Sequence, residues 1–90
     1  MTYNIIYVEE VVSKHIPLLP KTHRLTIQKA IERRLTIDPT GMGKPLQYSL
    51  KGYRRLRVGD YRIIYNINVE TQEVKIVAIM HRSVVYTRYN

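Results

Sequence analysis

The sequence has 90 residues, a formal net charge of +8 and no cysteine. A chain of this length buries only about two-thirds of its unfolded surface, so we expect one domain, residues 1–90, without a separate cofactor-binding unit. The lack of cysteine excludes a disulfide framework and a thiolate metal site, and the apolar run at residues 5–7 is too short for a membrane span or a secretion signal. We therefore expect a cytoplasmic protein with no cofactor and no membrane partner.

The first half of the chain predicts one strand followed by two helices. Alternating side chains at residues 2–8 indicate the strand. Two glutamates then suit the first turn of a short helix over residues 9–16, because acidic side chains complement the helix dipole, and Pro17 and Pro20 end it. Residues 21–37 carry apolar side chains at helical spacing, which predicts the main amphipathic helix. Its apolar stripe is expected to cover one face of a sheet.

The second half predicts three strands. Residues 40–47, with two glycines and a proline, indicate a loop. Residues 53–58 and 61–67 are rich in aromatic and β-branched side chains around a Gly-Asp pair, which predicts a hairpin with a two-residue connection. Residues 73–81 form a nearly continuous apolar run, typical of a central strand buried on both faces. The element order predicts an α+β domain with a mostly antiparallel four-stranded sheet and both N-terminal helices on one side.

The register of this hairpin gathers arginines on one sheet face. If Val58 faces Tyr61 across the turn, then Arg57 faces Arg62. Alternation places Arg55, Arg57, Arg62 and Ile64 on one face, and Arg54, Leu56, Ile63 and Tyr65 on the other. Like charges directly opposite destabilise a sheet by about 0.2–1 kcal/mol, and a bound anion would reverse this effect. Guanidinium groups suit phosphate, so we expect a phosphate-binding face, with a solvated basic face as the alternative.

Positive charge is concentrated around the hairpin. Residues 44–62 contain six cations against one anion, a net charge of +5. This positive charge would attract a nucleic acid or an acidic protein. Tyr53 is expected on the arginine face, where it can stack on an RNA base, with packing against a helix as the alternative. Arg54 shares the other face with apolar residues. We therefore expect its side chain to extend past the edge of the core, with the charged end in water, or to pair with a carboxylate such as Glu32 or Glu70.

Three motifs together resemble the RelE/ParE superfamily of bacterial type II toxins. They are LKGYRRLRVGDYRIIY at residues 50–65, GKPL at residues 43–46 and IMHRSVVY at residues 79–86. The helical segment at residues 15–35 is also similar to the helical pair of that superfamily, so the resemblance covers nearly the whole chain. It implies a RelE-like fold of the microbial ribonuclease type.

The resemblance also implies a toxin that a cognate antitoxin neutralises by wrapping its basic surface. Such a toxin meets operator DNA only through the antitoxin complex. The RelE branch cleaves mRNA in the ribosomal decoding site, uses the RNA 2′-hydroxyl as nucleophile and needs no metal. The ParE branch poisons DNA gyrase instead.

Three residues match functional positions of the superfamily. Arg62 in the DYR motif matches the phosphate-stabilising arginine, and Tyr86 matches the functional C-terminal tyrosine. Arg82 is the candidate for the other arginine of the superfamily. An ungapped alignment from Tyr86 puts that arginine nearer to Met80 or His81. The resemblance therefore gives Arg62, Tyr86 and Arg82 as catalytic candidates.

Two superfamily lysines are absent, which changes the expected proton transfers. Arg55 and Tyr53 stand where a well-studied branch has lysines, and arginine is a poor general base because it stays protonated. The histidine at the end of the last strand can replace them, because imidazole exchanges protons near neutral pH, with a structural role for it as the alternative. Our hypothesis is that His81 acts as general acid or base while Arg55, Arg57, Arg62 and Arg82 clamp the scissile phosphate. Lys51, Tyr53 and Arg57 are expected to bind the RNA.

Three functions stay open at this point. The leading one is a ribosome-dependent mRNA endonuclease that inhibits translation, which His81, Arg62 and Tyr86 together favour. The missing lysines favour the alternatives, a ParE-type gyrase inhibitor or a non-catalytic corepressor that only binds the antitoxin. His15 and His23 lie on or beside helices without a recognisable partner, so we expect them to be helix-surface or helix-packing residues.

Overall fold

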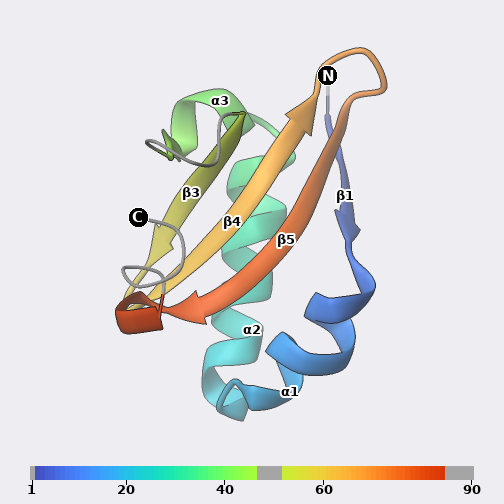
Figure 1. The fold of residues 1–90 in the computed structure, drawn as a ribbon. Coiled ribbons are helices and arrows are strands. Elements are labelled where there is room, and N and C mark those ends of the chain that lie inside the picture. The colour runs from blue at the N-terminus through green and yellow to red at the C-terminus, as the bar shows by residue number, and fades with distance from the viewer. Residues whose placement is uncertain (1, 47–51, 85–90) are drawn as a thin grey trace.

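One twisted sheet carries all the longer helices on a single side (Figure 1). The computed structural model describes residues 2–46 and 52–84. Within these ranges the strands are β1 (Asn4–Tyr7), β2 (Lys44–Pro45), β3 (Tyr53–Val58), β4 (Tyr61–Asn68) and β5 (Glu73–His81), in the spatial order β1-β5-β4-β3-β2. Strand β1 is parallel to β5 and the other pairs are antiparallel. The predicted α+β class is confirmed, but the expected count of four strands was wrong, because β2 adds a fifth.

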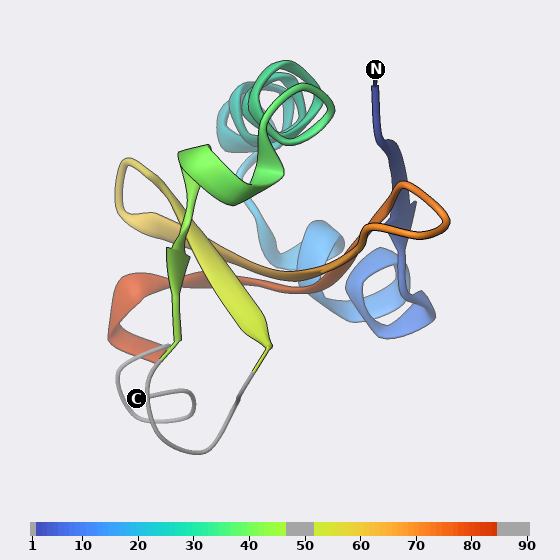
Figure 2. The same cartoon turned by 90° about the horizontal axis from the view of Figure 1, so that it is seen from above.

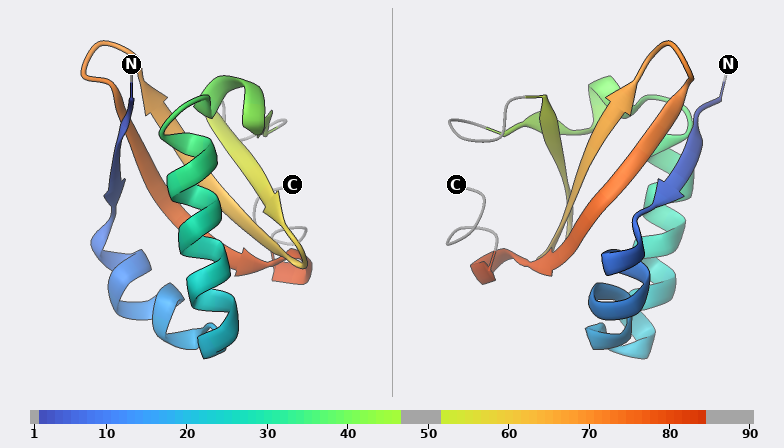
Figure 3. Two further views of the ribbon diagram at one scale, coloured as in Figure 1. Left: turned by 180° about the vertical axis from the view of Figure 1, so that it is seen from behind. Right: turned by 45° about the vertical axis from the view of Figure 1, so that its right-hand side comes forward.

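Both predicted helices form and pack on the same side of the sheet (Figure 3). The first begins at Glu9 and comprises a π-helical segment, η1 (Val11–His15), and α1 (Ile16–Leu18). It therefore extends to Leu18, two residues beyond its expected end. The second comprises α2 (Lys21–Ala30) and a π-helical continuation, η2 (Ile31–Leu35). Their apolar stripes face the sheet, as the helical spacing predicts.

The predicted loop at residues 40–47 is partly structured, which corrects the sequence-based expectation. It contains a short helix, α3 (Pro39–Met42), and the edge strand β2, which pairs with β3. The Asp38 carboxylate caps α3 by accepting the Gly41 N–H at 3.0 Å. Such short elements leave no periodic pattern, so side-chain contacts from the sheet must hold them.

Two side chains of the sheet provide those contacts. The hydroxyl of Tyr65 donates to the backbone oxygen of Pro39 at 2.6 Å. The guanidinium of Arg54 donates to the backbone oxygens of Thr40 and of Gly43, the latter at 2.8 Å. Arg54 thus binds α3 instead of the carboxylate partner suggested by the sequence. Burial raises the pKa of Tyr65, while the nearby Arg54 opposes this shift.

Apolar side chains are buried on both faces of the sheet. The main core lies under the helices and includes Val11, Leu19, Ile27, Ile31, Leu35, Leu56, Ile63, Tyr65, Val74, Ile76 and Ile79. A smaller cluster on the opposite face, here called the outer face, consists of Leu46, Ile64, Ala78 and Met80. Strand β5 contributes to both clusters, so its predicted position as a buried central strand is confirmed. Leu46, which follows β2, covers part of the outer face.

A β-bulge in β5 decides which face its last residues take. Ile64 pairs with Ala78, but the next residue of β4, Tyr65, pairs with Ile76. The extra residue, Val77, shifts the alternation of β5 by one position. Ile79 therefore joins the helix-side core, and His81, two residues further, lies on the helix side as well.

His15 accepts a hydrogen bond from the backbone of β5 beyond the point where the neighbouring parallel strand, β1, ends. Strand β1 pairs with β5 no further than Ile76. Beyond that point the N–H of Ile79 donates to Nδ1 of His15 at 3.1 Å. The histidine is only 9% exposed, so it is a packing residue, as expected, with a defined hydrogen-bonding role.

Replacing His15 by leucine is expected to lower the free energy of unfolding by about 1–3 kcal/mol, because the Ile79 N–H stays buried without its acceptor. Urea denaturation followed by circular dichroism measures the change. The exposed His23 offers a matched control, and its change to leucine is expected to cost less than about 0.5 kcal/mol. Equal losses in the two variants would contradict the assigned role.

Candidate nucleic-acid interface and active site

The predicted arginine face is formed by the hairpin register. Arg57 pairs with Arg62, Arg55 pairs with Ile64, and Val58 pairs with Tyr61, all as expected. Arg62 is only 7% exposed, and its Nη1 donates to the backbone oxygens of Gly59 at 2.9 Å and of Tyr61 at 3.0 Å. These contacts hold a buried positive charge beside the hairpin turn.

Arg82 reaches the same turn from the end of β5. Its backbone N–H donates to the Asp60 backbone oxygen at 2.8 Å, and its Nε lies 3.9 Å from the Asp60 carboxylate. The Arg82 side chain is 56% exposed, so this ion pair is worth little and can be exchanged for another anion. The structure thus brings Arg62 and Arg82 together at the turn.

His81 lies at the same end of the sheet but on the helix side. Its ring packs edge-on against Tyr61 at a centroid distance of 5.6 Å, and Tyr61 lies 5.2 Å from the ring of His23. Arg55 and Arg57 occupy the outer face, so the structure does not gather His81 with them on one surface. His81 can meet only a phosphate bound at the end of the sheet, near the turn.

The hydrogen bonds of His81 bear on its chemistry. The backbone N–H of Ser83 donates to Nδ1 at 3.3 Å, and the Ser83 hydroxyl lies 2.9 Å from the same atom. An Nδ1 that accepts a hydrogen bond favours the neutral tautomer with the proton on Nε2. In that state Nε2 offers a hydrogen bond and has no lone pair to accept a proton.

The remaining predicted RNA contacts fall into two groups. Tyr53 lies half-buried on the outer face against the cluster around Leu46, so it is on the predicted face and away from the helices. Lys51 and Tyr86 lie outside the described residues, and their predicted roles stay predictions.

The arginine face continues around the edge of β3 into a hollow of about 210 Å³. Five cationic side chains, together with Met42 and Leu56, line it, and no acidic side chain is among the described residues that do: the cations are Arg34, Lys44, Arg55, Arg57 and Arg62. From the sequence, Arg34 is expected to be a solvated helix residue or to touch ribosomal RNA or the antitoxin, and Lys44 is one of the six cations counted around the hairpin. The pairing of Lys44 with Arg55 depends on the unpredicted strand β2, so no sequence pattern reveals this grouping.

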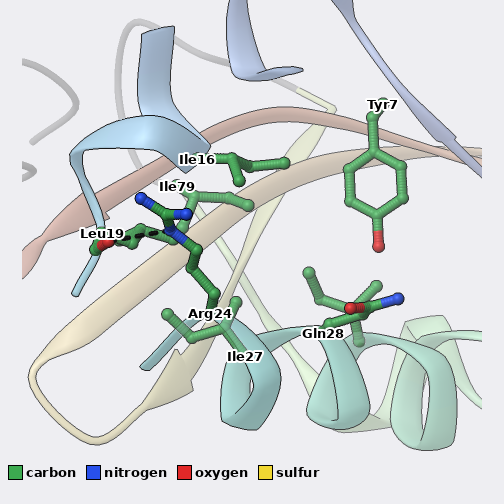
Figure 4. A pocket seen from close by; sticks show the side chains of 8 residues that line it. Tyr7, Ile16, Leu19, Arg24, Ile27, Gln28 and Ile79 are labelled. Carbon is green, nitrogen blue, oxygen red and sulfur yellow. Dashed lines mark hydrogen bonds between the residues drawn. The ribbon is translucent and has the colours of Figure 1, made fainter. Parts of the chain in front are cut away.

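A separate cavity of about 280 Å³ lies between the helices and the sheet (Figure 4). Its lining is mainly apolar, with the Tyr7 hydroxyl directed toward Gln28. Burial and the charge of Glu32 raise the pKa of Tyr7. Arg24 joins the helices by donating to the backbone oxygens of Leu19 and Pro17, each at 2.9 Å. This cavity is therefore unsuited to a phosphate.

Among residues 2–46 and 52–84, no group of three or more His, Asp or Glu side chains could hold a metal ion. In the same part of the chain, no helix is long and apolar enough to cross a membrane.

A family model described as "ParE toxin of type II toxin-antitoxin system, parDE" matches residues 11–86. The chain belongs to this toxin family. Two curated toxins from Mycobacterium tuberculosis are similar to this toxin: Toxin RelE is 41% identical over 49 residues, and Toxin RelG is 39% identical over 54 residues. These matches cover 54% and 60% of the chain, and 50% and 62% of the two relatives. The similarity in sequence thus spans between half and two-thirds of each relative.

Solved structures extend the likeness to nearly the full chain. The toxin in the RelBE2 toxin-antitoxin complex from M. tuberculosis aligns with a TM-score of 0.85 at 26% identity, covering 92% of this chain and 94% of that one. The archaeal RelE-RelB complex from Pyrococcus horikoshii gives 0.63 at 27% identity, covering 91% and 97%. A free mutant of E. coli RelE gives 0.74 at 18% identity, covering 99% and 95%, and this likeness shows the fold alone. The predicted RelE-like fold is confirmed.

Proposed function

We propose that this ParE-family toxin is a ribosome-dependent mRNA endonuclease that inhibits translation. The observation that carries the proposal is that Arg62 and Arg82 both contact the hairpin turn, Arg62 at Gly59 and Arg82 at Asp60, and that the ring of His81 packs on Tyr61 at the end of the same turn. A buried guanidinium and an exposed one can both bind a phosphate there, and a cationic face leads away from it along β3. The similarity to toxins named RelE and RelG supports the same function.

In the proposed reaction the RNA supplies its own nucleophile. The 2′-oxygen attacks the adjacent phosphorus as its proton passes to water, and the bond from phosphorus to the 5′-oxygen breaks as that oxygen takes a proton from His81, which leaves a 2′,3′-cyclic phosphate and a 5′-hydroxyl. Arg62 and Arg82 stabilise the charge that develops on the phosphate, while Arg55 and Arg57 hold the strand. Because arginines stay protonated, none of them accepts the 2′-proton, and Tyr86 keeps its predicted catalytic role.

We assign His81 the role of general acid. The charged imidazole that acts as the acid carries a proton on Nδ1 as well, so it gives up the hydrogen bond from the Ser83 N–H and can donate to the Ser83 hydroxyl instead, which lies 2.9 Å away. Nε2 then delivers its proton to the leaving 5′-oxygen.

Replacing His81 by glutamine is expected to lower the cleavage rate about 10²-fold or more. Single-turnover cleavage on programmed ribosomes measures the effect. His23→Gln is the matched control, because that ring packs against the same tyrosine. Full activity of His81→Gln across pH 6–8 would exclude the acid role.

A gyrase inhibitor is the second candidate, and two observations favour it. The matching family model is that of ParE toxins, and Nδ1 of His81 is already engaged, which leaves the site without a general base among residues 2–46 and 52–84. A non-catalytic protein that only binds the antitoxin is the third.

One experiment separates the three functions. Purified toxin is added to an in vitro translation reaction, mRNA 5′ ends are mapped by primer extension, and gyrase supercoiling is assayed in parallel. Codon-phased cuts that require ribosomes support the endonuclease, and gyrase-DNA cleavage complexes support the inhibitor. Silence in both assays supports the non-catalytic protein.

We further propose that a cognate antitoxin binds the cationic outer face and that operator DNA is met only through that complex. The similar toxins from M. tuberculosis and P. horikoshii were solved with antitoxins. An antitoxin can place acidic residues against the arginines of this face and apolar residues against the cluster around Leu46. We place this binding, and ribosome binding, in the cytoplasm. An antitoxin complex that leaves Arg55 and Arg62 as exposed as in the free toxin, and leaves the segment carrying Tyr86 in place, would contradict the proposal.

A further inference from the structure

The outer edge of β3 is open next to a fixed arginine. Strand β2 pairs with β3 only at Arg54 and Arg55, so within the described residues no strand lies beside the rest of that edge. Arg34, at the end of the long helix, reaches this edge, and its Nη1 donates to the backbone oxygen of Arg57 at 3.5 Å. In an antiparallel strand the N–H and C=O of one residue point to the same side. The Arg57 N–H therefore also points outward at the open edge.

The cationic hollow described above lies at this edge. Its cations come from four separate elements, namely η2, β2, β3 and β4. Two of the contacts are like-charge cross-strand pairs, Lys44 with Arg55 and Arg57 with Arg62. The ion pair between Arg82 and Asp60 involves none of Lys44, Arg55 and Arg57, and no acidic side chain is among the described residues that line the hollow. The protein thus gathers like charges around one space, which an anion would stabilise.

The layout favours a polyanionic chain over a single carboxylate. From above, β2 and β3 lie side by side and the hairpin turn lies at the far end of β3 (Figure 2). Cationic side chains lie along this path, from Lys44 on β2 to Arg62 on β4. A carboxylate would neutralise one charge of this row, whereas successive phosphates of a nucleic acid can neutralise several. Forked guanidiniums and an outward N–H both donate to phosphate oxygens.

We propose that this hollow binds a second phosphodiester of the RNA, next to the scissile phosphate, with Arg34 and Lys44 as its dedicated ligands. The inference rests on the proposed function for its substrate class. Arg34 adds a guanidinium whose direction is set by its bond to Arg57, and Lys44 adds a mobile charge on the opposite wall. The two residues bind and position the strand and take no part in the chemical step.

The test measures binding without cleavage. A fluorescein-labelled RNA hexanucleotide with 2′-O-methyl groups lacks the nucleophile, and its affinity is measured by fluorescence anisotropy over a range of salt concentrations. Arg34→Gln and Lys44→Gln are each expected to weaken binding about 5- to 10-fold. Each should also lower the slope of log K against log salt by about 0.7, the loss of one phosphate contact on a single strand.

The matched control is Arg33→Gln, which removes the same charge from the neighbouring helix position outside the hollow. It is expected to leave the slope unchanged. Arg34→Lys keeps the charge but loses the fork, and is expected to bind with intermediate affinity and a wild-type slope. Circular dichroism establishes that every variant is folded.

Three outcomes would overturn the proposal. The first is no binding of the hexanucleotide by the wild type, and the second is no larger loss in Arg34→Gln and Lys44→Gln than in Arg33→Gln. The third is an equal loss for a labelled hexaglutamate peptide, which would make the hollow a site for acidic proteins. Failure of the proposed function is distinguishable, because it shows as missing cleavage in the translation assay while the anisotropy result stands.

Discussion

Replacing Arg62 by glutamine is expected to reduce the rate of mRNA cleavage about 10²- to 10³-fold, which is the usual cost of removing one group that stabilises a transition-state charge. The buried guanidinium is held by the backbone of the hairpin turn, so its charge cannot move away as the phosphate becomes more negative. Single-turnover cleavage with saturating toxin on programmed ribosomes isolates the chemical step.

Arg57→Gln is the matched control for this prediction. Arg57 is directly opposite Arg62 on the same sheet face but is exposed, so its loss is expected to weaken binding about 10-fold and to leave the saturated rate nearly unchanged. Thermal melting identifies any variant that fails to fold. Equal saturated rates for Arg62→Gln and the wild type would exclude Arg62 from the reaction.

Replacing Gly43 by alanine is expected to destabilise the protein by about 3 kcal/mol, at the upper end of the usual cost of overpacking. A Cβ at this position would overlap the Tyr65 hydroxyl and lie 2.8 Å from the backbone oxygen of Arg55. The backbone of Gly43 is extended, with φ of −115°, so close approach and not backbone freedom requires the glycine. Urea denaturation measures the loss.

A double-mutant cycle gives this prediction its control. Tyr65→Phe removes the overlapping hydroxyl and also its hydrogen bond to Pro39. The double variant is expected to be more stable than the sum of the two single losses by about 1 kcal/mol or more, because the main clash is relieved. Strict additivity would show that the cost at Gly43 arises elsewhere.

The hairpin was predictable because its turn and its side chains act locally. Gly59 has φ of 59°, which a glycine adopts easily, and the two-residue turn sets every later pairing from Val58–Tyr61 onward. The long helix was predictable for a similar reason, since its apolar spacing needs no information from the rest of the chain. Both elements are therefore found in the structure, as predicted.

Strand β2 and the position of Arg54 were not predictable in this way. A two-residue strand containing Pro45 has no pattern of its own, and its place depends on carbonyls held by Arg54 and Tyr65. These partners are separated by 11 and 26 residues from the atoms they bind. Contacts over such separations depend on the folded sheet.

The sequence by itself determined the fold class, the hairpin register and the face on which Arg55, Arg57 and Arg62 lie, because each follows from local turn chemistry and alternation. Only the tertiary structure decided the surroundings of His81. The run before it is apolar at nearly every position, so both faces are buried and no alternation marks the extra residue, Val77. Sheet pairing introduced the bulge there, and packing under the helices then put His81 on the side away from Arg55 and Arg57.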